Sequence, residues 1–162
     1  MEIVTSRCLI RPFSESDISD FMAYRNDMDW MRFQGFKGLT REEYREALIS
    51  ETDETRGVQL AVIHRETDRL IGDLYYRVDG DTCWIGYTIT PDSAQQGYAA
   101  EATQALLQRC ACRGFHRALA DVSPGNAASL ALLHKLGFRY VERTADDDLL
   151  FALPLIESSE RV

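Results

Sequence analysis

Residues 84–113 read WIGYTITPDSAQQGYAAEATQALLQRCACR, and this stretch decides the fold. Its first part, Trp84 to Thr90, is rich in β-branched and aromatic residues, which favours a strand, and Pro91 ends that strand. From Ala99 onward the apolar residues recur at helical spacing, and Gly114 follows as a C-terminal cap. The stretch therefore predicts one strand, one tight loop and one helix.

The loop between them, Ala94 to Ala100, reads AQQGYAA. Gly97 has no Cβ, so a ligand can approach its backbone closely. The first N–H groups of the following helix have no partners within the helix, and they lie at the positive end of its dipole. This pattern is typical of a phosphate or pyrophosphate site, although a turn that binds nothing has the same features. No Gly-Lys-Ser/Thr follows and no three glycines stand at dinucleotide spacing, which argues against a P-loop and a Rossmann fingerprint.

The composition is that of one globular domain. A chain of 162 residues has room for one hydrophobic core, and 45% apolar and 27% charged residues are ordinary values. No apolar run reaches the roughly 20 residues of a membrane span, and the amino terminus lacks a signal-peptide pattern. We therefore expect a cytoplasmic protein without a membrane partner. The net charge of −8 argues against nucleic acid as a partner.

The cysteines form neither a CxxC pair nor a Cys/His metal spacing. We therefore expect reduced, mostly buried thiols and no metal site. None lies in a motif that would lower its pKa, so none is predicted to carry an acyl group covalently. The four residues are Cys8, Cys83, Cys110 and Cys112.

The remaining segments predict further strands and helices on both sides of this central unit. Expected strands are Arg7 to Arg11, Gln59 to His64, Leu70 to Val78, Ala118 to Val122, Arg139 to Arg143 and Leu149 to Leu153. Expected helices run from Ser14 to about Asn26, from Thr40 to about Ser50 and from Ala127 to Leu136, and Glu157 to Val162 is expected to be a frayed tail. The resulting order, β-α-α-β-β-β-α-β-α-β-β, indicates a single three-layer α/β (α+β) domain.

Three further features allow a structural and a functional interpretation. The segment Asp29 to Gly38 is aromatic and punctuated by glycine, so its aromatic residues either fill the edge of the core or form a mobile pocket wall. His64 stands at a strand end beside charges, which favours a surface histidine over a catalytic one. Asp73 follows a strand glycine and is either a solvated carboxylate at a strand end or a base that acts through water.

Two segments read together resemble a known family. Gln96 to Ala102, QGYAAEA, is followed about thirty residues later by Asn126 to Phe138, NAASLALLHKLGF. The pair resembles the GNAT superfamily of N-acetyltransferases. Thr5 to Phe13, TSRCLIRPF, together with Leu70 to Asp73 and Ile85 to Tyr87, more narrowly resembles its ribosomal-protein N-acetyltransferase (RimJ/RimL-like) branch. The resemblance covers about residues 5–153 of a single domain, 1–162.

The resemblance implies a GNAT domain, which has a central mixed, mostly antiparallel sheet flanked by helices. It also implies acetyl-CoA as co-substrate and a primary amine as acceptor, with the protein a monomer or homodimer. The strand is expected to pair with the pantetheine arm, the loop to bind the pyrophosphate, and the start of the next helix to lie near the thioester. The residues in these positions are Tyr87, Thr88, Ile89 and Thr90; Gln95, Gln96, Gly97, Tyr98, Ala99 and Ala100; and Asn126 and Ser129.

The expected chemistry is direct attack of a neutral amine on the thioester carbonyl, with CoA leaving as a thiolate. Ser129 is the candidate donor of a proton to sulfur, unless it is an ordinary first-turn hydroxyl, and Asp73 is the candidate base. The acceptor pocket is expected to include Trp30, Phe33, Phe36 and Trp84. Three positions depart from family patterns: Ala94 lacks a phosphate donor, Trp84 replaces a glutamate, and Leu133 replaces a tyrosine acid.

The pKa of the acceptor amine helps to choose the substrate. An α-amine with pKa near 7.8 costs about 1 kcal/mol to deprotonate at pH 7, whereas a lysine near 10.4 costs about 4.6 kcal/mol. A site without an evident base is therefore more compatible with the α-amine of a protein or peptide N-terminus. Acetylation of an aminoglycoside or polyamine, and a CoA-binding sensor without catalysis, remain the alternatives.

Overall fold

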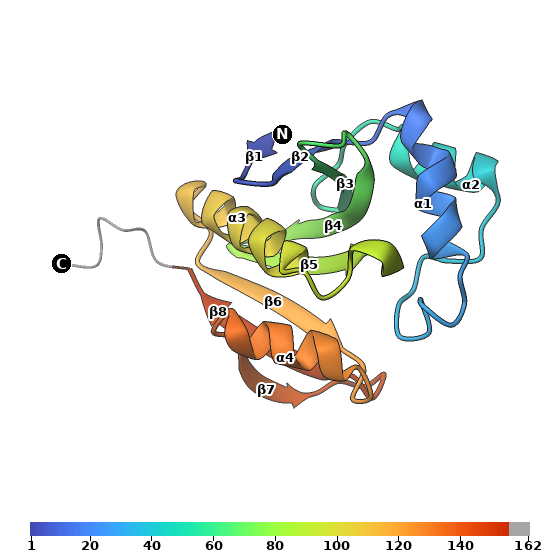
Figure 1. Cartoon of the computed structure of the whole chain (residues 1–162). Coiled ribbons are helices and arrows are strands. Elements are labelled where there is room, and N and C mark those ends of the chain that lie inside the picture. Colours follow the sequence, from blue (N-terminus) through green and yellow to red (C-terminus); the bar gives the residue numbers. More distant parts are fainter. Residues whose placement is uncertain (156–162) are drawn as a thin grey trace.

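The computed structural model describes residues 1–155, so the tail expected from Glu157 to Val162 lies outside the described residues (Figure 1). One sheet of eight strands has the order β1-β2-β3-β4-β5-β6-β8-β7. The strands are β1 (Ile3–Val4), β2 (Cys8–Pro12), β3 (Val58–His64), β4 (Leu70–Asp79), β5 (Thr82–Ile89), β6 (Arg117–Val122), β7 (Arg139–Arg143) and β8 (Leu149–Pro154). The α-helices are α1 (Ile18–Arg25), α2 (Arg41–Leu48), α3 (Tyr98–Cys112) and α4 (Ala127–Lys135).

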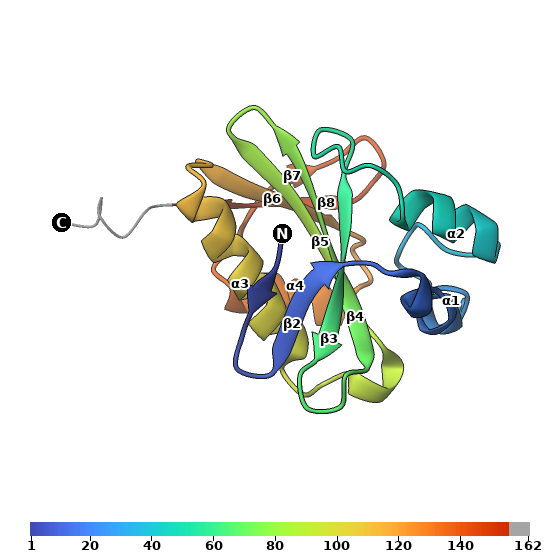
Figure 2. The same cartoon turned by 90° about the horizontal axis from the view of Figure 1, so that it is seen from above.

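Helices cover both faces of the sheet. Successive side chains of a strand point to opposite faces, and β3 shows this directly. Leu60 and Val62 belong to the core cluster that contains α3 and Leu133 of α4, whereas Ala61 and Ile63 pack with α1 and α2. Figure 2 shows α1 and α2 on one side of the strands and α3 on the other. The three-layer α/β prediction is therefore confirmed.

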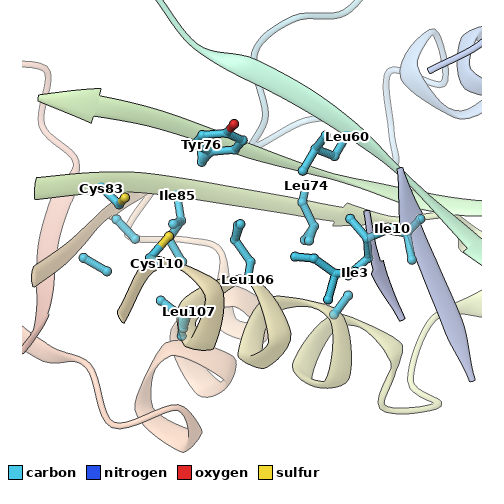
Figure 3. Close-up of a cluster of buried hydrophobic side chains, with 14 of the residues drawn as sticks. Ile3, Ile10, Leu60, Leu74, Tyr76, Cys83, Ile85, Leu106, Leu107 and Cys110 are labelled. Atoms are coloured by element: carbon cyan, nitrogen blue, oxygen red, sulfur yellow. The ribbon is translucent and has the colours of Figure 1, made fainter. Parts of the chain in front are cut away.

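The long helix α3 holds the larger core together. Its buried face carries Leu106, Leu107 and Cys110, which point at the sheet in Figure 3. Opposite them lie Leu74 and Ile85 of β4 and β5. Because β4 and β5 both pack on α3, the helix is held in a fixed position relative to the sheet. All four cysteines are free thiols, three of them buried and Cys112 exposed.

The N-terminal region differs from the prediction in two places. The two-residue strand β1 was missed, because Ile3 and Val4 are too few to show an alternating pattern. The helix expected from Ser14 begins instead as a 3-10 turn, Glu15–Asp17, and becomes α-helical at Ile18. The Ser14 N–H donates to the Asp17 carboxylate at 2.8 Å, which holds the tighter turn.

Strands β5 and β6 pair for only part of their length. They are the one parallel pair in the sheet of the described chain, and their register ends at Trp84 opposite Leu119. Beyond these residues no further β5–β6 partners occur within residues 1–155, so the two strands separate. This separation leaves the backbone edge of β5 exposed to a cavity. Among residues 1–155, no helix combines the length and apolarity needed to cross a membrane.

Candidate active site

The loop before α3 presents unpaired backbone donors. Gly97 is the N-cap residue, with φ 85°, and no side chain caps α3 within the described chain. The N–H groups of Tyr98, Ala99 and Ala100 start the helix and therefore have no partners inside it. Gln95 also has a positive φ, 60°, which an L-residue adopts only at a cost in free energy. A strained loop that opens onto free N–H groups is suited to an anion.

Arg7 holds this loop from the neighbouring strand connection. Its guanidinium donates to the Gln96 carbonyl at 2.9 Å and to the Glu101 carboxylate at 2.7 Å. It also lies over the ring of Tyr98, 4.2 Å from the ring centroid. These contacts tie the loop and the first turn of α3 to the segment before β2. The sequence analysis missed this support, because the partners lie about ninety residues apart in the chain.

A cavity of about 190 Å³ lies where β5 and β6 separate. Its walls come from β5, β6, the start of α4 and the 29–38 segment. They include Ile85, Gly86, Tyr87, Ala120, Asp121, Val122, Asn126, Ser129 and Leu133, with Phe33 and Gln34 above. A narrow slot along a free strand edge fits an extended chain that hydrogen-bonds to backbone.

Only alternate residues of β5 present their backbone groups to this slot. The Thr90 N–H donates to the Ile71 carbonyl of β4 at 2.9 Å. In an antiparallel pair, every second residue directs its backbone N–H and C=O groups toward the partner strand. The backbone groups of Thr88 therefore also point toward β4, whereas those of Tyr87 and Ile89 point toward the β6 side. The Ile89 carbonyl accepts a hydrogen bond from the Trp30 indole at 2.9 Å. Thr88 and Thr90 thus drop out as backbone ligands, which is a correction that strand periodicity explains.

Tyr87 and Ser129 meet across the slot. Their hydroxyl groups lie 2.8 Å apart, and the Ser129 N–H donates to the Asn126 side chain at 3.2 Å. Burial raises the pKa of Tyr87 to about 12, against the opposing effect of its bond to Ser129. The phenol therefore keeps its proton at neutral pH. The sequence analysis assigned Tyr87 for its backbone alone and so missed this hydroxyl.

A second, larger cleft of about 660 Å³ adjoins the slot. The two cavities share the lining residues Gln34, Gly35, Ile85, Gly86, Tyr87 and Asp121, so they adjoin along this part of β5 and β6. A Cβ on Gly86 would meet only Tyr75, at 3.6 Å or more, so the junction is unobstructed. A molecule in the larger cleft can therefore reach a group held in the slot.

The predicted acceptor-pocket residues divide between these cavities. Trp84 and Phe36 line the larger cleft, and Phe33 lines the slot. Trp30 lines neither, because its indole is bonded to the end of β5. In the 29–38 segment, Phe36 packs on Phe21 and Tyr44 at the edge of the core, as the structural interpretation predicts, and it also lines the larger cleft. The mobile pocket wall stays a prediction.

A comparison with known families identifies the fold. A model of the acetyltransferase (GNAT) domain family matches residues 7–139. The chain belongs to the GNAT acetyltransferase family. It is therefore an acyltransferase enzyme.

Individual GNAT proteins resemble this chain over most of its length. It is 33% identical over 146 residues to the uncharacterized N-acetyltransferase YnaD of Bacillus subtilis (strain 168), covering 86% of this chain and 83% of that protein. The structure resembles RimL, a ribosomal L7/L12 alpha-N-protein acetyltransferase in complex with coenzyme A (TM-score 0.83, 18% identity, 96% and 98% of the two chains). It also resembles the Vibrio cholerae spermidine N-acetyltransferase in complex with CoA and spermine (TM-score 0.81, 14% identity, 93% and 97%). The latter two share the fold while their names give different acceptors, so the fold leaves the acceptor open.

The residues present in this GNAT domain fit acetyl-CoA. The uncapped start of α3 offers N–H donors for the pyrophosphate, and a Cβ at Gly97 would lie 3.3 Å from the Arg7 guanidinium that holds the loop. The free edge of β5 suits the pantetheine amides, and Asn126 and Ser129 stand at the far wall of the slot. Among the described residues, no group of three His, Cys, Asp or Glu is placed to hold a metal ion.

Asp73 is not a solvated carboxylate at a strand end. It lies within β4 with 1% of its surface exposed, and Arg25 pairs with it at 2.6 Å. The Tyr24 hydroxyl and the Gln59 amide also donate to it. Burial, followed by the charge of Asp73, raises the pKa of Tyr24 well above its usual value. With three donors on its carboxylate, Asp73 is poorly placed to take a proton from substrate.

Arg25 extends this buried pair to the acceptor side. Its guanidinium also donates to the Gly35 carbonyl at 3.1 Å and to the Thr88 hydroxyl at 3.3 Å. It thereby connects the 29–38 segment to β4 and β5. Arg25 is itself buried, with 4% of its surface exposed.

Asp121 is a carboxylate that the sequence analysis missed. It lies near the end of β6, is solvent-exposed and lines both cavities. Desolvation and the negative charges of Asp148 and Asp146 raise its pKa, while Arg77 acts in the opposite direction. A carboxylate with raised pKa at the junction is suited to accept a proton. In the sequence Asp121 occupies an outward-facing position of a strand, as any surface acid can, so the pattern did not identify it as a site residue.

Proposed function

We propose that this GNAT enzyme transfers the acetyl group of acetyl-CoA directly to a primary amine, and that the preferred amine is the α-amine of a protein or peptide. One observation carries the proposal: Gly86, Tyr87 and Asp121 line both cavities, and the Tyr87 hydroxyl meets the Ser129 hydroxyl in the slot. This supports a proton acceptor and a proton donor close to the region where amine and thioester would meet.

The residues divide the work of the reaction between them. The N–H groups at the start of α3 hold the pyrophosphate, and the Tyr87 backbone pairs with the pantetheine arm. Asp121 takes a proton from the ammonium form of the acceptor, and the neutral nitrogen attacks the thioester carbonyl carbon. The nitrogen loses its second proton to solvent as the tetrahedral intermediate collapses to the amide. As the carbon–sulfur bond breaks, the Tyr87–Ser129 hydroxyl pair gives the departing sulfur a proton. After product release, Asp121 gives its proton to solvent, and the Tyr87–Ser129 pair regains a proton from solvent.

The exposed position of Asp121 favours an acceptor that loses its proton easily. Even with a raised pKa a carboxylate is a weaker base than an amine, and an α-amine needs about 3.5 kcal/mol less than a lysine to become neutral at pH 7. The resemblance of Thr5 to Phe13 to the ribosomal-protein branch supports the same choice. We place the enzyme in that RimJ/RimL-like branch, acting in the cytoplasm as a monomer or homodimer.

An acceptor panel tests this proposal. Purified enzyme with acetyl-CoA is given peptides with free or blocked N-termini, polyamines and aminoglycosides, and CoA thiol release is measured with product mass. We expect acetylation at the α-amine of free peptides and none when that amine is blocked. Acetylation of polyamines or aminoglycosides alone would select the small-molecule function, and CoA binding without any product would select the sensor.

A further inference from the structure

Arg77 projects into the larger cleft without a polar partner. It lies on β4 directly opposite Trp84 of β5, and its guanidinium stacks on that ring, 5.3 Å from the centroid. Within residues 1–155 the guanidinium makes no hydrogen bond and no ion pair. Stacking uses the face of the group and leaves its in-plane N–H donors available.

Arg77 differs from the other arginine of the cleft, Arg25, in that no carboxylate neutralises it in the described chain. Arg25 and Asp73 also line the cleft, but they neutralise each other beneath its floor, with 5% and 1% of their side chains exposed. Arg77 and Asp121 remain, and they form no ion pair with each other in the described chain. The cleft therefore presents one carboxylate at the junction and one cation with unused donors further along the sheet.

We infer that Arg77 is a specificity-determining residue that binds a carboxylate of the acceptor, on the premise that the enzyme acetylates amines as proposed above. A planar guanidinium on an aromatic platform matches a carboxylate through two parallel N–H donors. The amine of the same acceptor then lies toward Asp121 and the thioester. An acceptor with several positive charges, such as a polyamine, meets the unpaired cation and is disfavoured.

The identity of Trp84 gains a physical reason from this inference. A carboxylate side chain at this cross-strand position would pair with Arg77 and neutralise it. Tryptophan instead orients the guanidinium by stacking and leaves its charge for the ligand.

Matched acceptors test the inference. The peptides Ala-Asp-Ala-amide and Ala-Asn-Ala-amide differ only in one side-chain carboxylate, and alanine and alaninamide differ only in the α-carboxylate. We expect the wild-type enzyme to prefer the carboxylate member of at least one pair by about tenfold or more in kcat/KM, as a charged hydrogen bond provides. The pair that shows the preference tells whether the carboxylate is that of a side chain or of a free amino acid.

Two variants assign the preference to Arg77. Arg77→Met keeps much of the side-chain volume, so we expect the preference to fall to about twofold or less, mainly through a higher KM for the carboxylate acceptor. Arg77→Lys keeps the charge and should retain part of the preference. Arg139→Met, on the exposed edge strand β7, removes the same charge outside the cleft and should leave the preference unchanged.

The outcomes separate this inference from the proposed function. Acetylation of both members of each pair at equal rates, or an unchanged preference in Arg77→Met, would overturn the role of Arg77 while amine acetylation stands. A preference for the amide members or for spermidine would also overturn it. Absence of acetylated product from every amine, with acetyl-CoA still bound, would instead reject the proposed function.

Discussion

In the proposed function the loop before α3 binds the donor and the larger cleft binds the acceptor, and the two regions are built in opposite ways. The loop presents backbone N–H groups of consecutive residues at the start of α3. The cleft uses side chains from distant strands, such as Arg25 paired with Asp73 and Arg77 stacked on Trp84. The difference teaches that the donors of the loop follow from consecutive backbone groups, although Arg7 supports them from 89 residues away, whereas the cleft is built from side chains paired between distant elements.

Removing Arg25 should have the largest effect and should damage the acceptor side selectively. Arg25→Met leaves the carboxylate of Asp73 buried without its cation, which costs about 3–5 kcal/mol of folding free energy. Chemical denaturation measures the loss. We also expect the CoA-induced rise in melting temperature to survive in the folded fraction, because α3 packs on the opposite face of the sheet.

A double variant provides the control for this prediction. Arg25→Met with Asp73→Leu removes both charges and should regain much of the lost stability. If Arg25→Met alone unfolds at the wild-type denaturant concentration, the pair does not hold the acceptor side together.

Gly97→Val should have the next largest effect and should act on the donor side. The branched side chain crowds the approach to the α3 N-terminus, and the φ of 85° disfavours it. A ligand at 100 times its dissociation constant adds about 2.7 kcal/mol of stability, and we expect most of this gain to be lost. Thermal melts with and without acetyl-CoA measure the change.

Gly114→Val is the matched control for backbone strain. Gly114 has a similar φ of 91°, and nothing lies within 4 Å of its Cβ position. The control should lose stability without losing the ligand-induced shift. A full shift in Gly97→Val would contradict the assignment of the loop.

The smallest effect is expected at the hydroxyl pair between the two regions. Ser129→Ala and Tyr87→Phe each remove one hydroxyl, and a thiolate needs little help to leave because its pKa is near 8.5. We expect turnover to fall by roughly 10- to 100-fold, about 1.4 to 2.7 kcal/mol, with little change in CoA affinity. The double variant should lose little more, since the hydroxyls act as a unit. Wild-type turnover in both single variants would return Ser129 to an ordinary first-turn hydroxyl.

The sequence predicted the fold well because its elements are locally determined. The strand–loop–helix unit, the caps at Thr40 and Asn126, and the buried face of α3 follow from neighbouring residues. The two-residue strand β1 and the 3-10 start of the first helix were missed because each involves too few residues to show a period.

The site was predicted in part for the same reason. The start of α3 was identifiable from Gly97 and its neighbours. The burial of Asp73 was not, because its partner Arg25 lies 48 residues earlier. Asp121 occupies an outward strand position that resembles any surface acid, and only the separation of β5 from β6 places it at a cavity junction. The burial of Asp73 and the position of Asp121 at the cavities depend on contacts between distant segments, which a local sequence pattern does not show.

The pH dependence of kcat/KM for wild type and Asp121→Asn tests most directly the claim that Asp121 is the base at the junction. Partial desolvation at the cavity wall and the neighbouring acids Asp148 and Asp146 raise the pKa of Asp121, so wild-type activity should fall with decreasing pH as this carboxylate becomes protonated, at a pH above the usual range of aspartate. Asp121→Asn should lower kcat/KM by about 10²- to 10⁴-fold and abolish this acidic limb. Glu66→Gln, at an exposed turn between β3 and β4, serves as control and should behave like wild type. An Asp121→Asn enzyme with wild-type kcat/KM and an unchanged acidic limb would contradict the account.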